Sequence, residues 1–593
     1  MVSGNSDSCQ SAVCLIKCKI GVTARKLRSQ LTETNRKSGW IQTAFTLYAF
    51  GNFGRTIRTE DLFLSNITEE IKKRRTFAII SHPDAGKTTL TEKFLLYGGA
   101  INTAGSVKGK ANSKHAVSDW MEIEKERGIS VTSSVLQFEY EGKCINILDT
   151  PGHEDFSEDT YRTLMAADCA VMVIDASKGV EPQTIKLFKV CVMRHIPIFT
   201  FINKMDREAK DTFDLLDDIE KVLGIETCPI NWPIGCGKEF KGVYERASRN
   251  ILRFEAVSTG GAKEAKETII SADDENAADL IGEDFYENLM EEIELLDGAA
   301  ADLDMEKVHQ GKLSPVFFGS ALTNFGVEPF LEHFLKMTNR PLARTSNGEE
   351  VDPVENGFSA FVFKIQANMN KNHRDRIAFM RICSGKFEAN MEVKHVQSKK
   401  KMRLSQPQQI MAQERKIVEE AYAGDIIGVF DPGIFSIGDT VCLPKDDFEY
   451  EGIPTFAPEH FARVIQLDSM KRKQFVKGVE QIAQEGAIQI FQEHEAGFAE
   501  IIVGVVGTLQ FDVLKYRLEN EYNCEIRLEP LPYQAIRWIK DRNTDMNKLR
   551  GVSEVKKVKD MRGNPLLLFK NEWGIQFVLD RNEGLELVEF SKE

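Results

Sequence analysis

The stretch Ser81-His82-Pro83-Asp84-Ala85-Gly86-Lys87-Thr88-Thr89-Leu90 decides the fold of this chain. Its first residue, Ser81, is also the last residue of a short apolar run, residues 75–81, which is typical of a buried parallel strand. An apolar strand that leads into a Gly-Lys-Thr turn indicates a P-loop, here with Ser81 at the position of the usual first glycine. Because serine is small enough for that turn, we expect residues 81–89 to surround the phosphates of a nucleotide.

The residue types of this loop fit phosphate chemistry. Backbone N–H groups from Asp84 to Thr88 can bind phosphate oxygens beside the positive end of the helix that follows. The Lys87 ammonium can reach the β- and γ-phosphates, and the Thr88 hydroxyl can ligate Mg²⁺. The loop therefore predicts a nucleoside triphosphate site that holds a magnesium ion.

Four further apolar runs follow in the order expected of an open α/β sheet: residues 143–149, 169–175, 197–203 and 314–319. The first ends at Asp149, which can hold the metal, and continues as Asp149-Thr150-Pro151-Gly152-His153. The Gly152 N–H can bond to the γ-phosphate, which would let this loop distinguish GTP from GDP. Since ligands bind at the carboxyl ends of such strands, we expect these motifs to share one site.

The motif Asn203-Lys204-Met205-Asp206 predicts which base is bound. The Asp206 carboxylate can accept hydrogen bonds from N1–H and the 2-amino group of guanine, whereas adenine would leave it unpaired. Asn203 can either bind the O6/N7 edge or brace the P-loop, and the Lys204 stem can cover one face of the ring. Backbone N–H groups of Ser320 and Ala321 can contact O6. We therefore expect GTP and GDP as ligands.

A polar segment at residues 119–134 separates the P-loop from Asp149. Its charge and its glycine fit a loop that is ordered only by GTP and Mg²⁺, although the same charge pattern is also typical of a solvated helix. Within this segment, Ser130 or Thr132 can supply a second hydroxyl ligand to the metal, and the sequence leaves that choice open.

Composition narrows the possible classes of protein. The chain has 593 residues, 42% of them hydrophobic and 28% charged, which excludes a wholly disordered or fibrous protein. With 76 basic and 90 acidic residues its formal charge is −14, which argues against binding nucleic acid by bulk positive charge. No apolar run is long enough for a transmembrane helix.

The spacings between the cysteines do not match those of a zinc site. Cys144, Cys169 and Cys191 fit buried thiols in a reducing cytosol.

Three motifs together resemble the translational GTPases: Arg127-Gly128-Ile129-Ser130, Asp149-Thr150-Pro151-Gly152-His153 and Asn203-Lys204-Met205-Asp206. The finer resemblance is to the bacterial class II release factors, the family of peptide chain release factor three. It extends from about residue 68 to the C-terminus, with supporting stretches at residues 74–92, 232–238, 358–369, 373–379 and 504–513.

The resemblance implies roles for individual residues. His153 would orient the attacking water, Lys87 and Thr88 would contact phosphate and Mg²⁺, and Asp84 would shape the P-loop or help to bind a cation. Pro83 would belong to an apolar gate beside His153. Most translational GTPases have Thr where this chain has Ser130, and both side chains carry a hydroxyl that can ligate the metal.

The resemblance also implies an activity and partners. The expected protein is a ribosome-stimulated GTP hydrolase of translation termination, which promotes release and recycling of class I release factors after peptide release. Its expected cofactors are GTP/GDP and Mg²⁺. Its expected partners are the rRNA and ribosomal proteins of the factor site and, indirectly, the class I release factors. We expect a cytoplasmic monomer without membrane contact.

The predicted fold is an α/β P-loop GTPase domain followed by a β-barrel domain and an α+β domain. The expected boundaries are residues 67–345, with a helical insertion at about 240–312, then 346–460 and 461–593. Residues 1–66 are poor in acids and are predicted to be a disordered extension, with organelle targeting or an accessory role as alternatives. Strand-like runs at 358–369, 376–382, 391–396, 426–430 and 440–443 carry the barrel prediction.

Other functions remain as alternatives. A GTPase like elongation factor G, acting in translocation or ribosome protection, needs about two more domains than the residues after 461 allow. A peptidyl-tRNA-hydrolysing factor needs a Gly-Gly-Gln loop, and the Gly-Gly pairs here are followed by alanine. The basic stretch 394–403 fits either a hairpin that contacts rRNA or a solvated turn. The stretch 537–540 fits either RNA contact or a tryptophan that is simply buried.

Overall fold

The computed structural model describes residues 59–101, 123–124, 130–255, 266–367, 376–404, 407–411, 414–453, 456–493 and 501–588. The predictions for residues 1–58 and for most of the polar segment 119–129 lie outside these ranges. No helix in these ranges is both long and apolar enough to cross a membrane.

The predicted disordered extension is wrong for its last residues. Residues 59–66 form the first part of helix α2 (Thr59–Lys73). The last turn of this helix contains Lys72 and Lys73, whose positive charges interact favourably with the helix dipole. Ile67 and Ile71, one turn apart, are buried in the core of the second domain. The start of this helix was overlooked because the prediction rested on the composition of the whole segment 1–66.

The first domain is built on a seven-stranded sheet in the order β2-β3-β1-β4-β5-β11-β6. All described pairs are parallel except β2 with β3. The five predicted strands are present, with β2 and β6 added. The strands are β1 (Arg74–Ser81), β2 (Ser134–Tyr140), β3 (Lys143–Asp149), β4 (Cys169–Asp175), β5 (Ile198–Asn203), β6 (Glu226–Pro229) and β11 (Leu313–Phe318).

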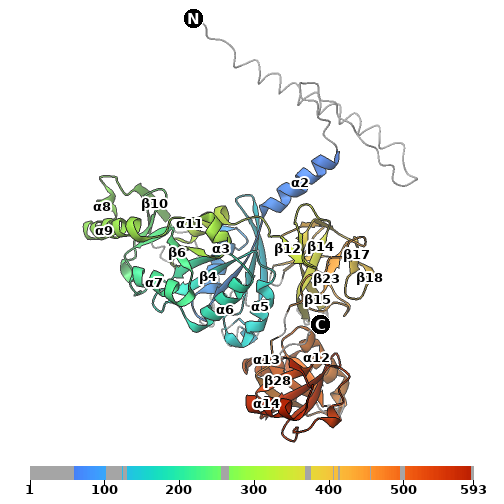
Figure 1. The fold of residues 1–593 in the computed structure, drawn as a ribbon. Coiled ribbons are helices and arrows are strands. Elements are labelled where there is room, and N and C mark those ends of the chain that lie inside the picture. The colour runs from blue at the N-terminus through green and yellow to red at the C-terminus, as the bar shows by residue number, and fades with distance from the viewer. Residues whose placement is uncertain are drawn as a thin grey trace, which may run out of the picture. The chain divides into compact units, whose positions relative to one another are not determined.

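Alternate side chains of β1 enter two different cores, so helices cover both faces of the sheet (Figure 1). Ala78 and Ile80 pack with helices α5 (Ser157–Leu164), α6 (Pro182–Met193) and α7 (Thr212–Leu223). Phe77 and Ile79 pack with α3 (Lys87–Tyr97), α10 (Met305–His309) and α11 (Val327–Met337). Burial on both faces explains why these strands have continuous apolar runs rather than alternating ones.

The insertion predicted as helical, at about 240–312, also contains three strands among the described residues, β8, β9 and β10. A four-stranded antiparallel sheet, in the order β10-β9-β8-β7, precedes helices α8 (Ala277–Ile281) and α9 (Glu283–Ala299). Its strands are β7 (Asn231–Ile234), β8 (Gly242–Glu245), β9 (Asn250–Glu255) and β10 (Lys266–Ser271). The acidic, alanine-rich composition that suggested helices belongs to the later part of the insertion. The short hairpin of β8 and β9 was therefore missed.

The second domain is the predicted barrel domain. An eight-stranded antiparallel sheet surrounds one apolar core that includes Val362, Met380 and Val441. Its strands are β14 (Ser359–Ala367), β15 (Arg376–Ser384), β17 (Glu392–His395), β18 (Lys400–Arg403), β19 (Gln408–Met411), β20 (Glu414–Ile417), β22 (Ile426–Phe430) and β23 (Thr440–Cys442). β16 (Lys386–Glu388) and β21 (Glu420–Tyr422) form a separate pair, and β17 and β18 make the basic hairpin.

The third domain is α+β, as predicted. Helices α12 (Arg472–Gln484), α13 (Leu509–Asn520) and α14 (Glu572–Arg581) accompany a sheet in the order β27-β24-β26-β25-β29-β30-β28-β31. Its strands are β24 (His460–Gln466), β25 (Gln489–Glu493), β26 (Ile501–Val505), β27 (Ile526–Leu531), β28 (Ala535–Ile539), β29 (Lys556–Asp560), β30 (Pro565–Phe569) and β31 (Leu587–Val588). Trp538 is buried in this domain.

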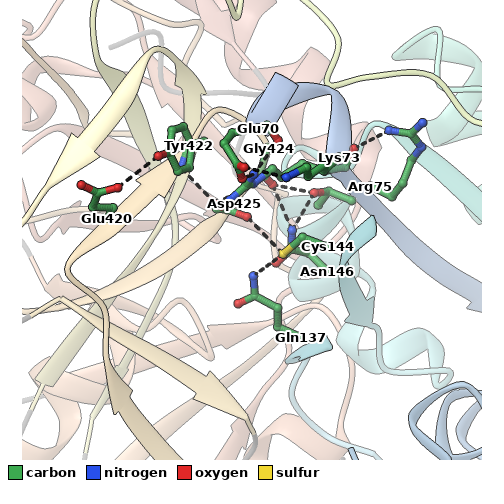
Figure 2. Close-up of polar contacts among 12 residues, drawn as sticks. Glu70, Lys73, Arg75, Gln137, Cys144, Asn146, Glu420, Tyr422, Gly424 and Asp425 are labelled. Carbon is green, nitrogen blue, oxygen red and sulfur yellow. Dashed lines mark hydrogen bonds and ion pairs between the residues drawn. The ribbon is translucent and has the colours of Figure 1, made fainter. Parts of the chain in front are cut away.

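Buried polar contacts join the start of the first sheet to the barrel turn around Asp425 (Figure 2). Arg74 Nε donates to Asp425 Oδ2 at 3.1 Å, and the Arg74 guanidinium lies 4.5 Å from the centre of the Tyr422 ring. The Gly424 carbonyl accepts from the Thr76 hydroxyl at 2.5 Å. The Cys144 thiol lies 3.8 Å from Asp425 Oδ1, and burial raises its pKa to about 12, so it stays protonated.

A second buried ion pair joins the same two domains. Arg381 of the barrel donates to Asp168 Oδ2 at 2.5 Å and to the Thr76 hydroxyl at 3.2 Å. The other Asp168 oxygen accepts from the Leu342 N–H at 3.2 Å. Both pairs lie at the amino end of β1, opposite the P-loop.

We predict that Arg74→Met lowers the free energy of unfolding by about 3 kcal/mol, because it leaves the Asp425 carboxylate buried without its cation. The two side chains are 10% and 6% exposed. Chemical denaturation followed by circular dichroism measures the change. Lys72→Met is the matched control, since its pair with Glu69 is 54% and 65% exposed and is worth less than about 1 kcal/mol.

The double variant Arg74→Met/Asp425→Leu should recover most of this loss, since an apolar pair replaces both charges. Equal stability of Arg74→Met and Lys72→Met would contradict the importance of the buried pair.

Candidate functional site

A cavity of about 470 Å³ opens at the carboxyl ends of the central strands. Most of the residues predicted for the nucleotide line it: Ser81, His82, Pro83, Asp84, Gly86, Lys87, Thr88, Thr89, Ser130, Gly152, His153, Asn203, Lys204, Asp206 and Ala321. The sequence motifs that lie up to 240 positions apart (81–321) therefore meet at one site, as the topology of a parallel sheet requires.

Three predicted residues, Ala85, Asp149 and Ser320, are buried and do not line the cavity. Each is bonded to a residue that does. The Ala85 carbonyl accepts from Asn203 at 2.8 Å, Asp149 Oδ1 accepts from Lys87 at 2.9 Å, and the Ser320 hydroxyl donates to Asp206 Oδ1 at 2.6 Å. They act as supports of the cavity wall.

Asn203 resolves one alternative that the sequence left open. Its side-chain amide donates to the Ala85 carbonyl at 2.8 Å, and its carbonyl accepts from the Ala321 N–H at 2.9 Å. Both ends of the amide are therefore occupied by protein, and Asn203 braces the P-loop against the loop at residues 320–321.

Position 86 requires glycine for two reasons, its backbone conformation and the close approach of the Asn203 side chain. Its φ is +101°, which is strained for a residue with a side chain. A Cβ atom at this position would lie 2.2 Å from Asn203 Nδ2. The glycine of the P-loop and the asparagine of the base motif are therefore one packing unit.

Lys204 is held by a residue that the sequence reasoning did not select. Its Nζ donates to the Asp84 carbonyl at 2.5 Å and to Asp175 Oδ2 at 2.6 Å. Burial alone would raise the pKa of Asp175, but hydrogen bonds from Lys204 and Ser177 outweigh it and lower that pKa. Asp175 is the last residue of a predicted strand, and its position at the carboxyl end of that strand was the signal that could have identified it as a site residue.

Four other cavity residues were also missed: Ser177, Lys178, Arg207 and Leu322. They lie in loops that follow the selected strands and motifs, where spacing gives no pattern to recognise. Lys178 pairs with Glu181 at 3.1 Å, and this hydrogen bond raises the pKa of Lys178.

The predicted metal ligands are hydroxyls and one carboxylate near Lys87. The Lys87 ammonium is buried and bonded to Asp149 Oδ1 and to the Thr150 carbonyl. Thr88 and Ser130 both line the cavity. Hard oxygen donors of this kind suit Mg²⁺, which keeps several waters and takes few protein ligands. Within the described ranges, no cluster of three or more His, Cys, Asp or Glu is arranged for a metal.

The geometry separates Ser130 from Thr132. Ser130 lines the nucleotide cavity, whereas Thr132 lies outside it and its N–H donates to Glu124 Oε1 at 3.1 Å. Of the two hydroxyl-bearing residues, Ser130 is therefore the one that lines the same cavity as Thr88.

His153 lies at the wall of the cavity, with its side chain 34% exposed. It caps the short helix η1 (Glu154–Phe156), since its Nδ1 accepts from the Asp155 N–H at 3.2 Å. The opposite ring nitrogen, Nε2, is therefore left for a partner other than this cap. Gly152 lies beside the P-loop, since a Cβ atom there would be in ordinary contact with Pro83 Cα, at 3.4 Å.

We predict that Gly86→Ala weakens nucleotide binding by at least about 100-fold, since the new methyl must displace Asn203 and the backbone is strained. Titration with a fluorescent guanine nucleotide measures the dissociation constant. Gly298→Ala in α9 is the control, because a Cβ atom there meets nothing within 4 Å. Equal affinity of the two variants would refute the packing argument.

Comparison with known proteins covers all three domains. The family model described as Elongation factor Tu GTP binding domain matches residues 72–340. The model described as Elongation factor G domain 2 matches residues 357–443, and that described as Class II release factor RF3, C-terminal domain, matches residues 450–579. A crystal structure of a Thermus thermophilus protein has the same fold, with a TM-score of 0.63 at 21% identity over 82% of this chain and 72% of that one.

Two whole-length relatives identify the family. Peptide chain release factor 3 of Symbiobacterium thermophilum is 58% identical over 522 residues, which cover 88% of this chain and 98% of that protein. Peptide chain release factor 3 of Gloeobacter violaceus is 54% identical over 526 residues, covering 88% and 99%. The chain thus belongs to the peptide chain release factor 3 family.

Proposed function

We propose that this chain is a ribosome-stimulated GTP hydrolase that promotes release and recycling of class I release factors after peptide release. The family membership makes it a GTPase of translation termination. The observation that carries the finer proposal is the combination of a guanine-type site with a C-terminal domain of the release-factor kind, at residues 450–579.

Guanine selection rests on Asp206. Its Oδ1 accepts from the Ser320 hydroxyl at 2.6 Å, which fixes the carboxylate at the cavity wall. The carboxylate can then accept from N1–H and the 2-amino group of guanine, a pair of donors that adenine lacks. Lys204, tied to Asp84 and Asp175, supplies an aliphatic stem beside the same position.

Hydrolysis of GTP is attack of water on the γ-phosphate, with GDP and phosphate as products. Positioning and charge stabilisation account for most of such catalysis. Lys87 and the P-loop N–H groups would hold the phosphates, and His153 would orient the water. Thr88 and Ser130 would ligate Mg²⁺ directly and Asp149 through water, and the ion would neutralise the charge that develops on the phosphate oxygens.

Exposure of His153 supports a trigger from outside the domain. The ring lies at the cavity wall, and about a third of its side chain is exposed. The rRNA at the factor site of the ribosome would move the ring toward the water. The net charge of −14 suits a protein that visits a polyanion briefly and then leaves.

We predict that His153→Ala lowers ribosome-stimulated GTP turnover by at least about 100-fold, because the water loses its orienting group. Nucleotide affinity should stay within about twofold, since the ring contributes no phosphate donor. Release of labelled phosphate measures the rate of GTP turnover, once with and once without ribosomes. Turnover equal to that of the parent would remove His153 from the mechanism.

We also predict that the parent chain with GTP ejects a labelled class I release factor from ribosomes after peptide release. GDP alone should not substitute, because the proposed switch depends on the γ-phosphate. Fluorescence loss from the ribosome-bound factor reports the ejection, and movement of tRNA and mRNA is monitored in parallel. Translocation without ejection would favour an activity like that of elongation factor G.

A further inference from the structure

The loop that carries His153 is in contact with the third domain. Asp155, two residues after the histidine, lies between His153 and the start of α13. Its Oδ2 accepts from the Leu509 N–H at 2.7 Å. On the other side, its Oδ1 lies 3.3 Å from His153 Nδ1, and its own N–H donates to the same ring nitrogen at 3.2 Å. One residue therefore links the imidazole to a helix of another domain.

Gly507 makes this link possible. Its φ lies outside the left-handed range, so its backbone conformation suits any residue. A Cβ atom there would nevertheless lie 2.1 Å from Asp155 Cγ and 2.4 Å from Asp155 Cβ. The position thus requires glycine because Asp155 packs against it, which is a constraint between domains and not a constraint of the turn.

The turn that receives Asp155 is rigid. The buried Gln510 accepts from the Val506 N–H at 2.9 Å and from the Gly507 N–H at 3.1 Å, and it donates to the Ala487 carbonyl at 2.9 Å. The Leu509 N–H is one of the N–H groups that a helix leaves without an internal partner, so Asp155 completes the helix start. The Asp155 side chain is 12% exposed.

Apolar packing and a second polar contact support the link. Phe156, beside Asp155, is buried with Val131 and with Val513 of α13. Further along the same segment, Arg162 donates to the Gly486 carbonyl at 3.1 Å. The third domain therefore holds the segment after His153 at two separated points.

We propose that Asp155 is a positioning residue for His153 in GTP hydrolysis, and that the third domain sets its position through Leu509 and Gly507. The inference rests on the role of His153 in the proposed function. With Nδ1 accepting from the Asp155 N–H, the ring has Nε2 left for the attacking water. A shift of the third domain would then reach the imidazole through the Asp155 carboxylate.

The test uses the full chain with ribosomes and compares Gly507→Ala, Asp155→Ala and Asp155→Asn. Gly507→Ala and Asp155→Ala should lower kcat by roughly 10- to 100-fold, since a small misplacement of a catalytic group has effects of this size. KM for GTP and the dissociation constant for a fluorescent GDP should stay within about twofold. Asp155→Asn should retain turnover within about threefold, since an amide oxygen still accepts from Leu509.

Two controls separate positioning from general damage. Gly574→Ala adds a methyl to the same domain, where the nearest atom is 3.4 Å away, and should leave kcat and the melting temperature unchanged. In a His153→Ala background, Gly507→Ala should cause no further loss, because residues that act through one another are not additive.

Unchanged or raised kcat in Gly507→Ala, or an undiminished loss in the His153→Ala background, would overturn the positioning role while leaving the proposed function intact. Full turnover of His153→Ala alone would overturn the role of His153, and this inference with it. A fall in kcat that comes with an equal rise in KM and lost thermal stability would also count against positioning.

Discussion

The amide of Asn203 fixes the geometry on which the nucleotide site depends. It joins the P-loop at Ala85 to the loop at Ala321, and each partner is 118 positions away along the chain. The amide fits only because Gly86 has no side chain, since a Cβ atom would lie 2.2 Å from Nδ2. The glycine, the asparagine and the alanine thus constrain one another, and the phosphate end and the base end of the cavity keep a fixed separation.

The third domain adds a constraint of a different kind. Asn203 connects loops within one sheet, whereas Asp155 and Arg162 connect the segment after His153 to residues 486–509. The first set of contacts holds the P-loop and the loop at Ala321 together. The second holds the segment after His153, so in the proposed function binding and hydrolysis would depend on separate parts of the molecule.

Local motifs made the first domain and most of its site predictable. The P-loop, Asp149 and Asn203 each follow an apolar strand, and a parallel sheet must bring such strand ends together. The tie between Lys204 and Asp175 and that between Asp155 and Leu509 were not predictable, because they join distant positions without a periodic signal. The strands at Gly242–Glu245 and Asn250–Glu255 were missed because the average composition of the segment outweighed two short apolar runs.

The buried pair of Arg74 and Asp425 has a consequence for synthesis of the chain. Its members are 351 positions apart. At 5–20 residues per second, roughly 20 to 70 s pass between their appearance. During that interval the first domain can fold with a cation at its edge, and Glu70, four positions before Arg74 and 2.5 Å from it, is the acid already available. The pair with the barrel can form only after Asp425 has been synthesised, so the order of translation limits the order in which the two domains can join.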